Sequence, residues 1–396
     1  MNEEEYYGII NFYDKNGNTM SPDTKIFIKK IDIITITYYL HHSVYLKIYK
    51  IINKIGSGGS GVVFKILDIT NKQNVDIFNK YSNFIATNNE YLALKLNTCK
   101  NETHVSSEAL LLIEIFNDLI IPEKYKYLPK FLGNDKLDFM ISSYFGNTNL
   151  ADLAYNIEQK NVLKIPHILN NILRQLSYYN TKFKHNDIKV TNIVLDDNYE
   201  PKIIDFGLST ANLTDLQDSS LVSFAPEGIL PFIIYKKMNM NAEKFKLKYK
   251  FLFNDNLYAS YDMIGFFWTM IDCFTNNKSH EILKIILQNE NIHYERLYCF
   301  YLRNVDIKKY LTDKYGINNV EFIKSHVDVS YVSNKVSLNK LIIDRTNPII
   351  LQYLFFNHLD GYNKYLDNMI DLILTPDSEM RISYKALLIN PFFNSV

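Results

Sequence analysis

Short apolar runs rich in Ile, Tyr, Val and Thr recur through the first third of the chain. Four of them lie at residues 25–37, 45–55, 62–69 and 90–97, and their β-branched and aromatic residues favour strands. Residues 70–90, between the last two runs, are polar and predict a loop. This pattern predicts a β-sheet near the start of the chain.

Helical spacing dominates after this region. Residues 104–119 open with Ser residues that can cap a helix and continue with strong helix formers. Between 164 and 183 one helical face would collect the apolar residues Ile165, Ile168, Leu169, Ile172 and Leu176. Residues 262–274 and 366–374 also predict helices. A strand-rich first third and a helix-rich remainder predict an α+β protein in two lobes.

The densest group of polar side chains lies within residues 182–209. The apolar segments "IVLDD" and "PKIIDF" flank the turn-like "DNYEP", so residues 193–204 predict a β-hairpin. The two ends of a hairpin return to one edge, which can bring together Asp187, Lys189, Asn192 and Asp205. Carboxylate and amide oxygens suit Mg²⁺, and an ammonium group suits phosphate. The stretch therefore predicts a site for a divalent cation and a polyphosphate.

The same residues follow the order H-x-D-x-K-x-x-N and then D-F-G, which resembles the catalytic and metal-binding loops of eukaryotic-type protein kinases. The resemblance implies a bilobal protein-kinase fold, with a strand-rich N-lobe and a helical C-lobe. It implies that Asp187 orients the substrate hydroxyl and accepts its proton, while Lys189 steadies the γ-phosphate. Asn192 and Asp205 would bind Mg²⁺ or Mn²⁺. The position of Lys189 matches the Ser/Thr pattern rather than the tyrosine pattern.

A glycine cluster, "GSGGSGVV", fits the kinase pattern G-x-G-x-x-G-x-V. Strand-like runs flank it on both sides, whereas a dinucleotide fold would need a helix after the glycines. "LALK" then places a lysine on the next strand, where the family's lysine contacts the α- and β-phosphates. The implied ATP-binding residues are Ile55, Gly56, Gly58, Gly61, Val63, Ala93 and Lys95, the backbone of Ser143 and Phe145 at the adenine edge, and Asp152 near the ribose.

Two glutamates compete as the partner of Lys95. Glu108 and Glu114 lie six residues apart in the predicted helix, so they project about 240° apart and at most one faces the lysine. We expect Glu108, because "SSEALLLIEIF" followed by "LPKFLG" resembles the casein-kinase-like branch. The hinge pattern in "MISSYFG" also places a small Ser142 behind the adenine, which predicts an open pocket there.

Three further features resemble the kinase C-lobe: an Ala-Pro-Glu at 225–227, Asp262 as the buried brace of the catalytic loop, and Arg381 as the partner of the Ala-Pro-Glu carboxylate. The resemblance covers about 48–275 and 366–394. We expect residues 1–47 to be an extension packed on the N-lobe, 48–145 the N-lobe and 146–396 the C-lobe. Insertions are expected near 232–257 and 276–365.

Two departures from the family bear on regulation and substrates. Asn186 stands where many members carry the Arg that receives an activation-loop phosphate, so we expect activity without that switch. Residues 232–257 are rich in lysine. They are either a solvated surface or a dock for acidic or already phosphorylated protein substrates.

Composition adds limits rather than chemistry. The 396 residues have a formal net charge of zero, so no overall field draws the chain to nucleic acid. The start of the chain does not resemble a signal peptide, and no apolar run is long enough to span a membrane, so we expect a cytoplasmic protein. Arginine is scarce, which fits an AT-rich genome such as that of a large DNA virus or a protist. Oligomeric state has no signal in the sequence.

The sequence thus predicts an ATP-dependent Ser/Thr protein kinase, with two alternatives. One is a small-molecule phosphotransferase similar to choline or aminoglycoside kinases, which share a His-x-Asp loop but usually lack Asp-Phe-Gly and Ala-Pro-Glu. The other is a pseudokinase scaffold, a class that typically loses the lysine, the catalytic Asp or the metal-binding Asp. All three of those residues are present here.

Overall fold

The computed structural model divides the chain into two compact units, Met1–Phe145 and Gly146–Val396. The described residues are 7–21, 27–58, 61–78, 81–87, 89–97, 104–118, 121–133, 137–185, 187–209, 261–279, 281–282, 342, 344–356, 383–390 and 393. Asn186, the triplet at 225–227, the lysine-rich 232–257, the predicted helix at 366–374 and Arg381 lie outside them. No helix of the described part is long and apolar enough to cross a membrane.

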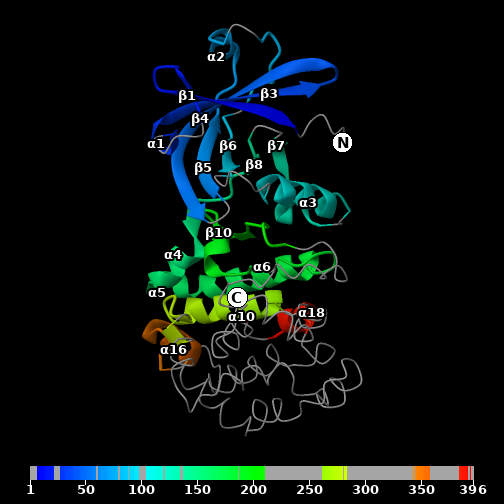
Figure 1. Cartoon of the computed structure of the whole chain (residues 1–396). Coiled ribbons are helices and arrows are strands. Elements are labelled where there is room, and N and C mark those ends of the chain that lie inside the picture. The colour runs from blue at the N-terminus through cyan, green and yellow to red at the C-terminus, as the bar shows by residue number, and fades with distance from the viewer. Residues whose placement is uncertain are drawn as a thin grey trace, which may run out of the picture. The chain divides into compact units, whose positions relative to one another are not determined.

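The first unit is built on an eight-stranded antiparallel sheet (Figure 1). Its strands are β1 (Gly8–Asp14), β2 (Thr19–Met20), β3 (Ile31–Leu40), β4 (Ser43–Gly58), β5 (Gly61–Asp68), β6 (Tyr91–Leu96), β7 (Pro129–Leu132) and β8 (Phe139–Ser143). They run in the order β2-β1-β3-β4-β5-β6-β8-β7. A bridge between Tyr7 and Leu132 brings the start of β1 against β7, so the sheet curls until its two sides meet.

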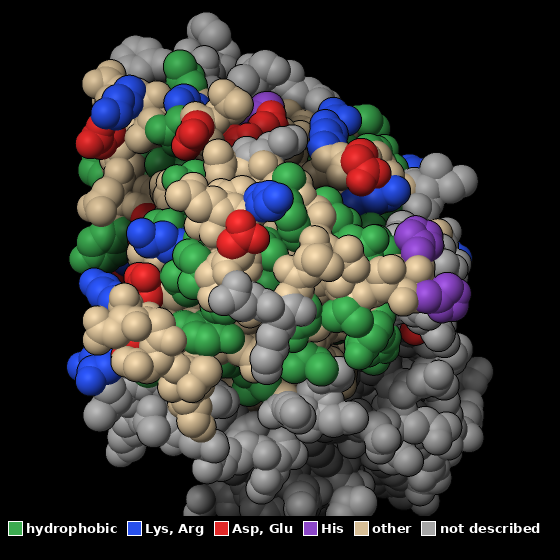
Figure 2. Space-filling view, turned by 90° about the horizontal axis from the view of Figure 1, so that it is seen from above, with side chains coloured by type: hydrophobic (Ala, Val, Ile, Leu, Met, Phe, Trp, Pro, Cys, Tyr) green, Lys and Arg blue, Asp and Glu red, His purple; other side chains and the backbone are tan. Residues whose placement is uncertain are grey.

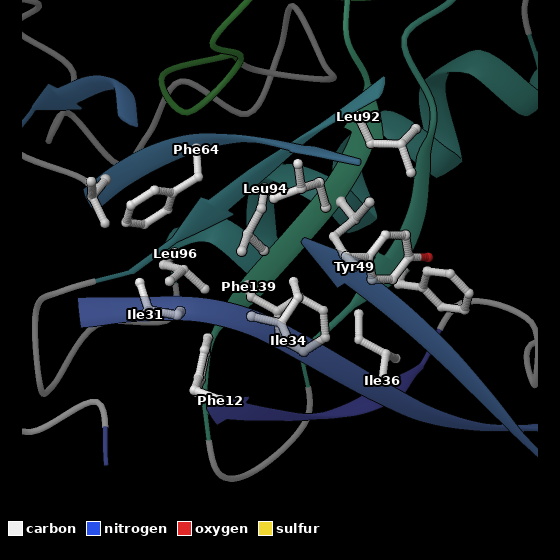
Figure 3. Packing of buried hydrophobic residues seen from close by; sticks show 14 of the residues in the cluster. Phe12, Ile31, Ile34, Ile36, Tyr49, Phe64, Leu92, Leu94, Leu96 and Phe139 are labelled. Atoms are coloured by element: carbon white, nitrogen blue, oxygen red, sulfur yellow. The ribbon is translucent and has the colours of Figure 1, made fainter. Parts of the chain in front are cut away.

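The curled sheet encloses the apolar core of this unit. Strand side chains alternate between faces, and on β6 the inward residues Leu92, Leu94 and Leu96 are at most 3% exposed. Ile34 and Ile36 from β3 pack into the same cluster, as Figure 3 shows. Residues before the kinase-like region therefore supply part of the wall and part of the core of this unit.

Helices complete the first unit: α1 (Phe27–Lys30), α2 (Lys72–Asp76), α3 (His104–Asp118) and a 3₁₀ helix (Glu123–Tyr125). The strand predicted at 25–37 is wrong at its start, because residues 27–30 form a helical turn before β3. The loop predicted at 70–90 contains α2, whose N-cap Asn71 accepts a hydrogen bond from the Asn74 N–H. Acidic and basic side chains are intermixed over the face shown in Figure 2.

The described part of the second unit is mostly helical, with a small three-stranded sheet. The helices are α4 (Leu150–Tyr155), α5 (Gln159–Val162), α6 (Lys164–Tyr179), α10 (Tyr261–Phe274), α16 (Pro348–Phe356), α18 (Tyr384–Leu388) and a 3₁₀ helix (Val190–Asn192). The strands are β9 (Thr148–Asn149), β10 (Ile193–Leu195) and β11 (Pro201–Ile203). Antiparallel pairing of β10 with β11 confirms the predicted hairpin.

Helix α6 organises this unit. Its predicted apolar face, from Ile165 to Leu176, is buried at every position, and the helix ends at Tyr179 rather than 183. It packs against α10 and α18 (Figure 1). Gln175 on this helix reaches the hairpin, because its amide donates to the Pro201 carbonyl at 2.7 Å and its oxygen accepts from the Ile203 N–H at 3.1 Å. The helix therefore fixes the hairpin beside which the polar residues lie.

Candidate active site

Each unit carries its own group of the predicted site residues. In the first unit, the glycine cluster closes the hairpin between β4 and β5, where Gly58 pairs with Gly61 and Gly56 with Val63. Gly61 has a φ of 149°, and a Cβ there would lie 2.0 Å from the Leu96 carbonyl oxygen. Any side chain at 61 would therefore push β5 and β6 apart. Position 61 therefore requires glycine, which leaves the backbone there uncovered by a side chain.

Lys95, Ala93 and Val63 share the face of the sheet opposite the core. Val63 pairs with Lys95 and Lys65 with Ala93 across β5 and β6. Since Leu92, Leu94 and Leu96 point into the core, the alternation sends Ala93 and Lys95 to the other side. Ile55 on β4 is 42% exposed. The predicted nucleotide residues Val63, Ala93 and Lys95 thus stand on a face of β5 and β6 whose other side is packed in the core.

Glu108, and not Glu114, lies against Lys95. The Lys95 Nζ is 2.5 Å from the Glu108 Oε2, and Glu108 is only 3% exposed. Glu114 is exposed on the same helix α3. A buried ammonium is tolerated only beside an opposite charge. The ion pair therefore fixes the lysine on the sheet to the helix.

The start of α3 is held by a residue that the sequence analysis missed. The Asp138 carboxylate, from just before β8, accepts the N–H groups of Val105 at 2.8 Å and Ser106 at 2.6 Å. It also accepts from the Asn97 side-chain amide at 3.1 Å and from the Ser106 hydroxyl. An acidic group at a helix start satisfies free N–H groups and complements the helix dipole. Asp138 thus ties the end of β6 to the helix that carries Glu108.

The prediction of an open pocket beside Ser142 is wrong. Ser142 is 1% exposed, and its hydroxyl donates to the Tyr127 hydroxyl at 2.8 Å. The Tyr127 ring also contacts the Phe145 ring, with centroids 5.4 Å apart. A small residue at 142 is therefore accompanied by a large one from a neighbouring segment, which occupies the space. Ser143 and Phe145, the predicted backbone readers, are half-buried at the end of β8 and just after it.

In the second unit, Asp187 is the centre of a polar group. Its Oδ2 accepts the Lys189 ammonium and the Asn192 side-chain amide, each at 2.8 Å. The Asn192 amide also donates to the Asp187 carbonyl at 3.0 Å. Asp187 is 6% exposed. Three of the residues that the sequence predicted to converge are thus in direct contact.

His185 holds the backbone of the Asp187 loop through both of its ring nitrogens. Its Nε2 lies 3.0 Å from the Ile204 carbonyl oxygen, and its Nδ1 lies 3.3 Å from the Asp187 N–H. A carbonyl can only accept and a backbone N–H can only donate, so a neutral ring protonated at Nε2 satisfies both contacts. The His185 N–H donates to the Asp262 carboxylate at 2.8 Å, and Asp262 is 1% exposed on α10. Asp262 therefore braces the loop.

Asp205 is brought beside this loop by the hairpin. The Ile204 N–H donates to the Asn192 carbonyl at 2.9 Å, which joins the two ends of the hairpin. Asp205 has a φ of 64°, a left-handed conformation that is uncommon for residues other than glycine, although Asp adopts it more readily than most. The next residue, Phe206, is fully buried against the rings of Tyr179, Phe183 and His185. This aromatic packing holds the neighbouring Asp205, which is itself half-buried, in place.

Asn192 and Asp205 fit a divalent cation that completes its coordination with phosphate or water oxygens. Because the Asn192 amide nitrogen is used on Asp187, its amide oxygen is directed elsewhere and can serve as a ligand. Asp205 adds a carboxylate. The described residues contain no group of three or more His, Cys, Asp or Glu that could bind a metal without such help. Mg²⁺ commonly takes one or two protein ligands together with phosphate oxygens and water.

Asp152 has a structural role in addition to its predicted place near a ribose. It is exposed in the first turn of α4, where its carboxylate accepts the Asn149 N–H at 3.4 Å. The Asn149 side chain in turn accepts the Asp152 N–H at 2.8 Å. The pair forms a capping box.

Comparison with known proteins agrees with this geometry. Residues 49–229 match the family described as Protein kinase domain. The chain is 29% identical over 191 residues to the serine/threonine-protein kinase pakA of Dictyostelium discoideum, covering 48% of this chain and 14% of that protein. It is 25% identical over 188 residues to serine/threonine-protein kinase 1 of Arabidopsis thaliana, covering 47% of this chain and 20% of that protein.

These relatives are much longer than the matched region, so the chain spans a fifth or less of their length. A cysteine-rich receptor-like protein kinase 46 of Arabidopsis thaliana is 33% identical over 126 residues, covering 29% of this chain and 20% of that protein. The matched region contains the glycine hairpin, the Lys95–Glu108 pair, the Asp187 loop and Asp205. Residues 49–229 therefore resemble a protein kinase domain of the eukaryotic type, and the fold is the α+β fold of that family.

Proposed function

We propose that this chain is an ATP-dependent Ser/Thr protein kinase, which transfers the γ-phosphate of ATP to protein hydroxyls. The observation that carries the proposal is the contact of Asp187 with both Lys189 and Asn192. A carboxylate held by an ammonium and an amide is fixed in position and keeps an acceptor oxygen for a substrate hydroxyl. The spacing of Lys189 from Asp187 supports Ser and Thr as acceptors.

In the proposed reaction, the substrate hydroxyl oxygen bonds to the γ-phosphorus while the bond from that phosphorus to the β,γ-bridging oxygen breaks. ADP leaves, and the hydroxyl proton passes to Asp187. Lys189 would stabilise charge on the transferred group, and Lys95 would position the α- and β-phosphates. Mg²⁺ or Mn²⁺ held by Asn192 and Asp205 would neutralise phosphate charge. Positioning and charge stabilisation supply most of the rate in such transfers.

The nucleotide would be held by the face of β5 and β6 that carries Val63, Ala93 and Lys95, together with Ile55 and the glycine hairpin. Packed walls and glycine backbone suit a flat base and a polyphosphate, respectively. Backbone groups of Ser143 and Phe145 would read the adenine edge, and Asp152 would lie near the ribose. The Glu108 pair supports the role of Lys95 because it fixes the lysine.

Finer assignments are part of the same proposal. The sequence of α3 supports a place near the casein-kinase-like branch, and the lysines of 232–257 support acidic or already phosphorylated protein substrates. The scarcity of arginine supports an AT-rich source such as a large DNA virus or a protist. We also propose the cytoplasmic location that the sequence led us to expect.

The experiment that tests the function is transfer of label from γ-labelled ATP by the purified chain. We expect labelled casein in the presence of Mg²⁺ and none after EDTA is added, because phosphate charge is then unshielded. Parallel assays with choline and with an aminoglycoside test the small-molecule alternative. Binding of ATP without label transfer to any of these acceptors, or to the chain itself, would instead favour a pseudokinase.

A second prediction concerns Tyr127. Replacing it by Ala should open space beside Ser142, so ATP-competitive inhibitors with bulky aromatic groups should bind at least about tenfold more tightly, as expected for burial of one or two extra apolar groups. The Michaelis constant for ATP should change little, because ATP does not fill that space.

Ser142→Ala is the matched control, since it removes the hydroxyl contact but leaves the Tyr127 ring in place. Thermal melts check that both variants fold. If Ser142→Ala sensitises the enzyme to such inhibitors as strongly as Tyr127→Ala, then Tyr127 does not occupy the space.

A further inference from the structure

A pocket of about 380 Å³ opens at one end of the curled sheet. Along the strands, this end is opposite to the glycine hairpin. Its floor consists of Tyr38, Tyr49, Leu92 and Phe131, which belong to the core, and residues 85–87 form part of its wall. The glycine hairpin lies where β4 ends and β5 begins, whereas the pocket lies near the start of β4 and the end of β5. The pocket is therefore separate from the proposed nucleotide site.

The wall of the pocket is fixed before any ligand arrives. The segment before it is tied to β4, because the Leu46 N–H donates to the Asn83 carbonyl at 3.1 Å. The Thr87 N–H donates to the Thr70 carbonyl at 3.3 Å. Thr70 is itself buried and bonded to Asp68 and to Ile48. A preformed pocket of this size is typical of a small-molecule site, and such sites occur in the mouths of closed sheets.

One polar group at the floor, the Tyr49 hydroxyl, has no hydrogen-bond partner among the described residues. Tyr49 is 1% exposed, and among the described residues none forms a hydrogen bond with its hydroxyl. In Figure 3 its side chain lies at the end of the cluster near Leu92, and the hydroxyl oxygen points away from the middle of the cluster. Burial, with the nearby Asp68 charge, raises the pKa of Tyr49 well above its ordinary value, so the hydroxyl remains a donor.

The charges at the rim are already matched. The Lys47 ammonium lies 2.9 Å from Asp68, and the Lys130 ammonium lies 2.6 Å from Glu90. Asp68 also accepts the N–H and the hydroxyl of Thr70. A charged ligand would have to compete with these pairs, whereas a neutral one would leave them intact.

From these observations we infer that the pocket binds a small, uncharged, flat aromatic molecule of about two fused rings, with a hydrogen-bond acceptor that meets the Tyr49 hydroxyl. The rings of Tyr38 and Phe131, tilted with centroids 4.9 Å apart, offer faces and edges for aromatic contact. The acceptor gives a partner to a hydroxyl that forms no hydrogen bond with the described residues and borders the pocket. This site is independent of the proposed phosphotransfer.

Fluorine NMR on the full chain, with excess ADP and Mg²⁺ to occupy the nucleotide site, tests the inference. The probes are 6-fluoroquinoline, which has a ring nitrogen acceptor, and 2-fluoronaphthalene, which has the same shape without it. We expect Tyr49→Phe to weaken 6-fluoroquinoline binding about five- to tenfold, the effect of one lost hydrogen bond. Binding of 2-fluoronaphthalene should not change.

A second pair of variants locates the probe without touching the core. Ala86→Trp places a large side chain in the wall and should abolish binding of both probes. Ser82→Trp, at an exposed position of the same segment outside the pocket, should leave binding unchanged. The inference is overturned if 6-fluoroquinoline does not bind the unaltered chain, or if its binding survives both Tyr49→Phe and Ala86→Trp. Neither outcome bears on the proposed kinase activity, which is measured separately.

Discussion

Replacing Glu108 by Gln is expected to lower phosphotransfer about 100-fold, because the lysine that should position the nucleotide loses its fixed partner. The Lys95 ammonium lies 2.5 Å from the Glu108 carboxylate, and both side chains are largely buried. A neutral amide cannot offset a buried positive charge, so the lysine side chain should move toward water. Misplacement of a positioning group by about 1 Å can reduce turnover by this factor.

The same substitution should also destabilise the first unit, by up to about 3 kcal/mol, since the buried ion pair is lost and Lys95 must leave its packed position. Glu114→Gln is the matched control: the same chemical change on the same helix, but at an exposed position. It should alter neither turnover nor melting temperature. Initial rates at saturating ATP, with melts of both variants, separate loss of positioning from loss of fold. Equal rates for the two variants would remove Glu108 from the proposed mechanism.

The residues that the sequence predicted well are those whose contacts are local. Asp187, Lys189 and Asn192 lie within one short loop, so their spacing alone brings them together. The choice of Glu108 required only helical geometry and a motif. The hairpin of β10 and β11 required only apolar runs around a turn. In each case, few residues separate the groups that meet.

The features that the sequence missed depend on contacts between distant segments. Asp138 holds the start of α3 from more than thirty residues away along the chain. The sequence around Asp138 does not indicate that it caps a helix. Tyr127 fills the space beside Ser142 only because the segment before β7 packs against β8. The closure of the sheet through Tyr7 and Leu132 joins segments more than a hundred residues apart. Local pattern carries no information on such pairings.

Asp187→Asn should have the largest effect on activity of any single change in the second unit, a fall of about 10²–10⁴-fold. This is the usual contribution of a general base, and an amide cannot take up the hydroxyl proton. The fold should be retained, because an Asn oxygen can accept from Lys189 and Asn192 as the carboxylate does. Binding of a fluorescent ADP analogue should therefore be nearly unchanged.

Asp197→Asn provides the control for charge, since Asp197 is an exposed residue of the nearby hairpin turn and should be silent. Label transfer to casein, nucleotide binding and melting temperature are measured on all three forms of the chain. Loss of transfer with intact nucleotide binding and an intact melt is the expected pattern for Asp187→Asn. Full transfer by that variant would mean that Asp187 is not the acceptor of the hydroxyl proton. Loss of binding and fold together would make Asp187 a structural residue whose contacts with Lys189 and Asn192 hold the loop.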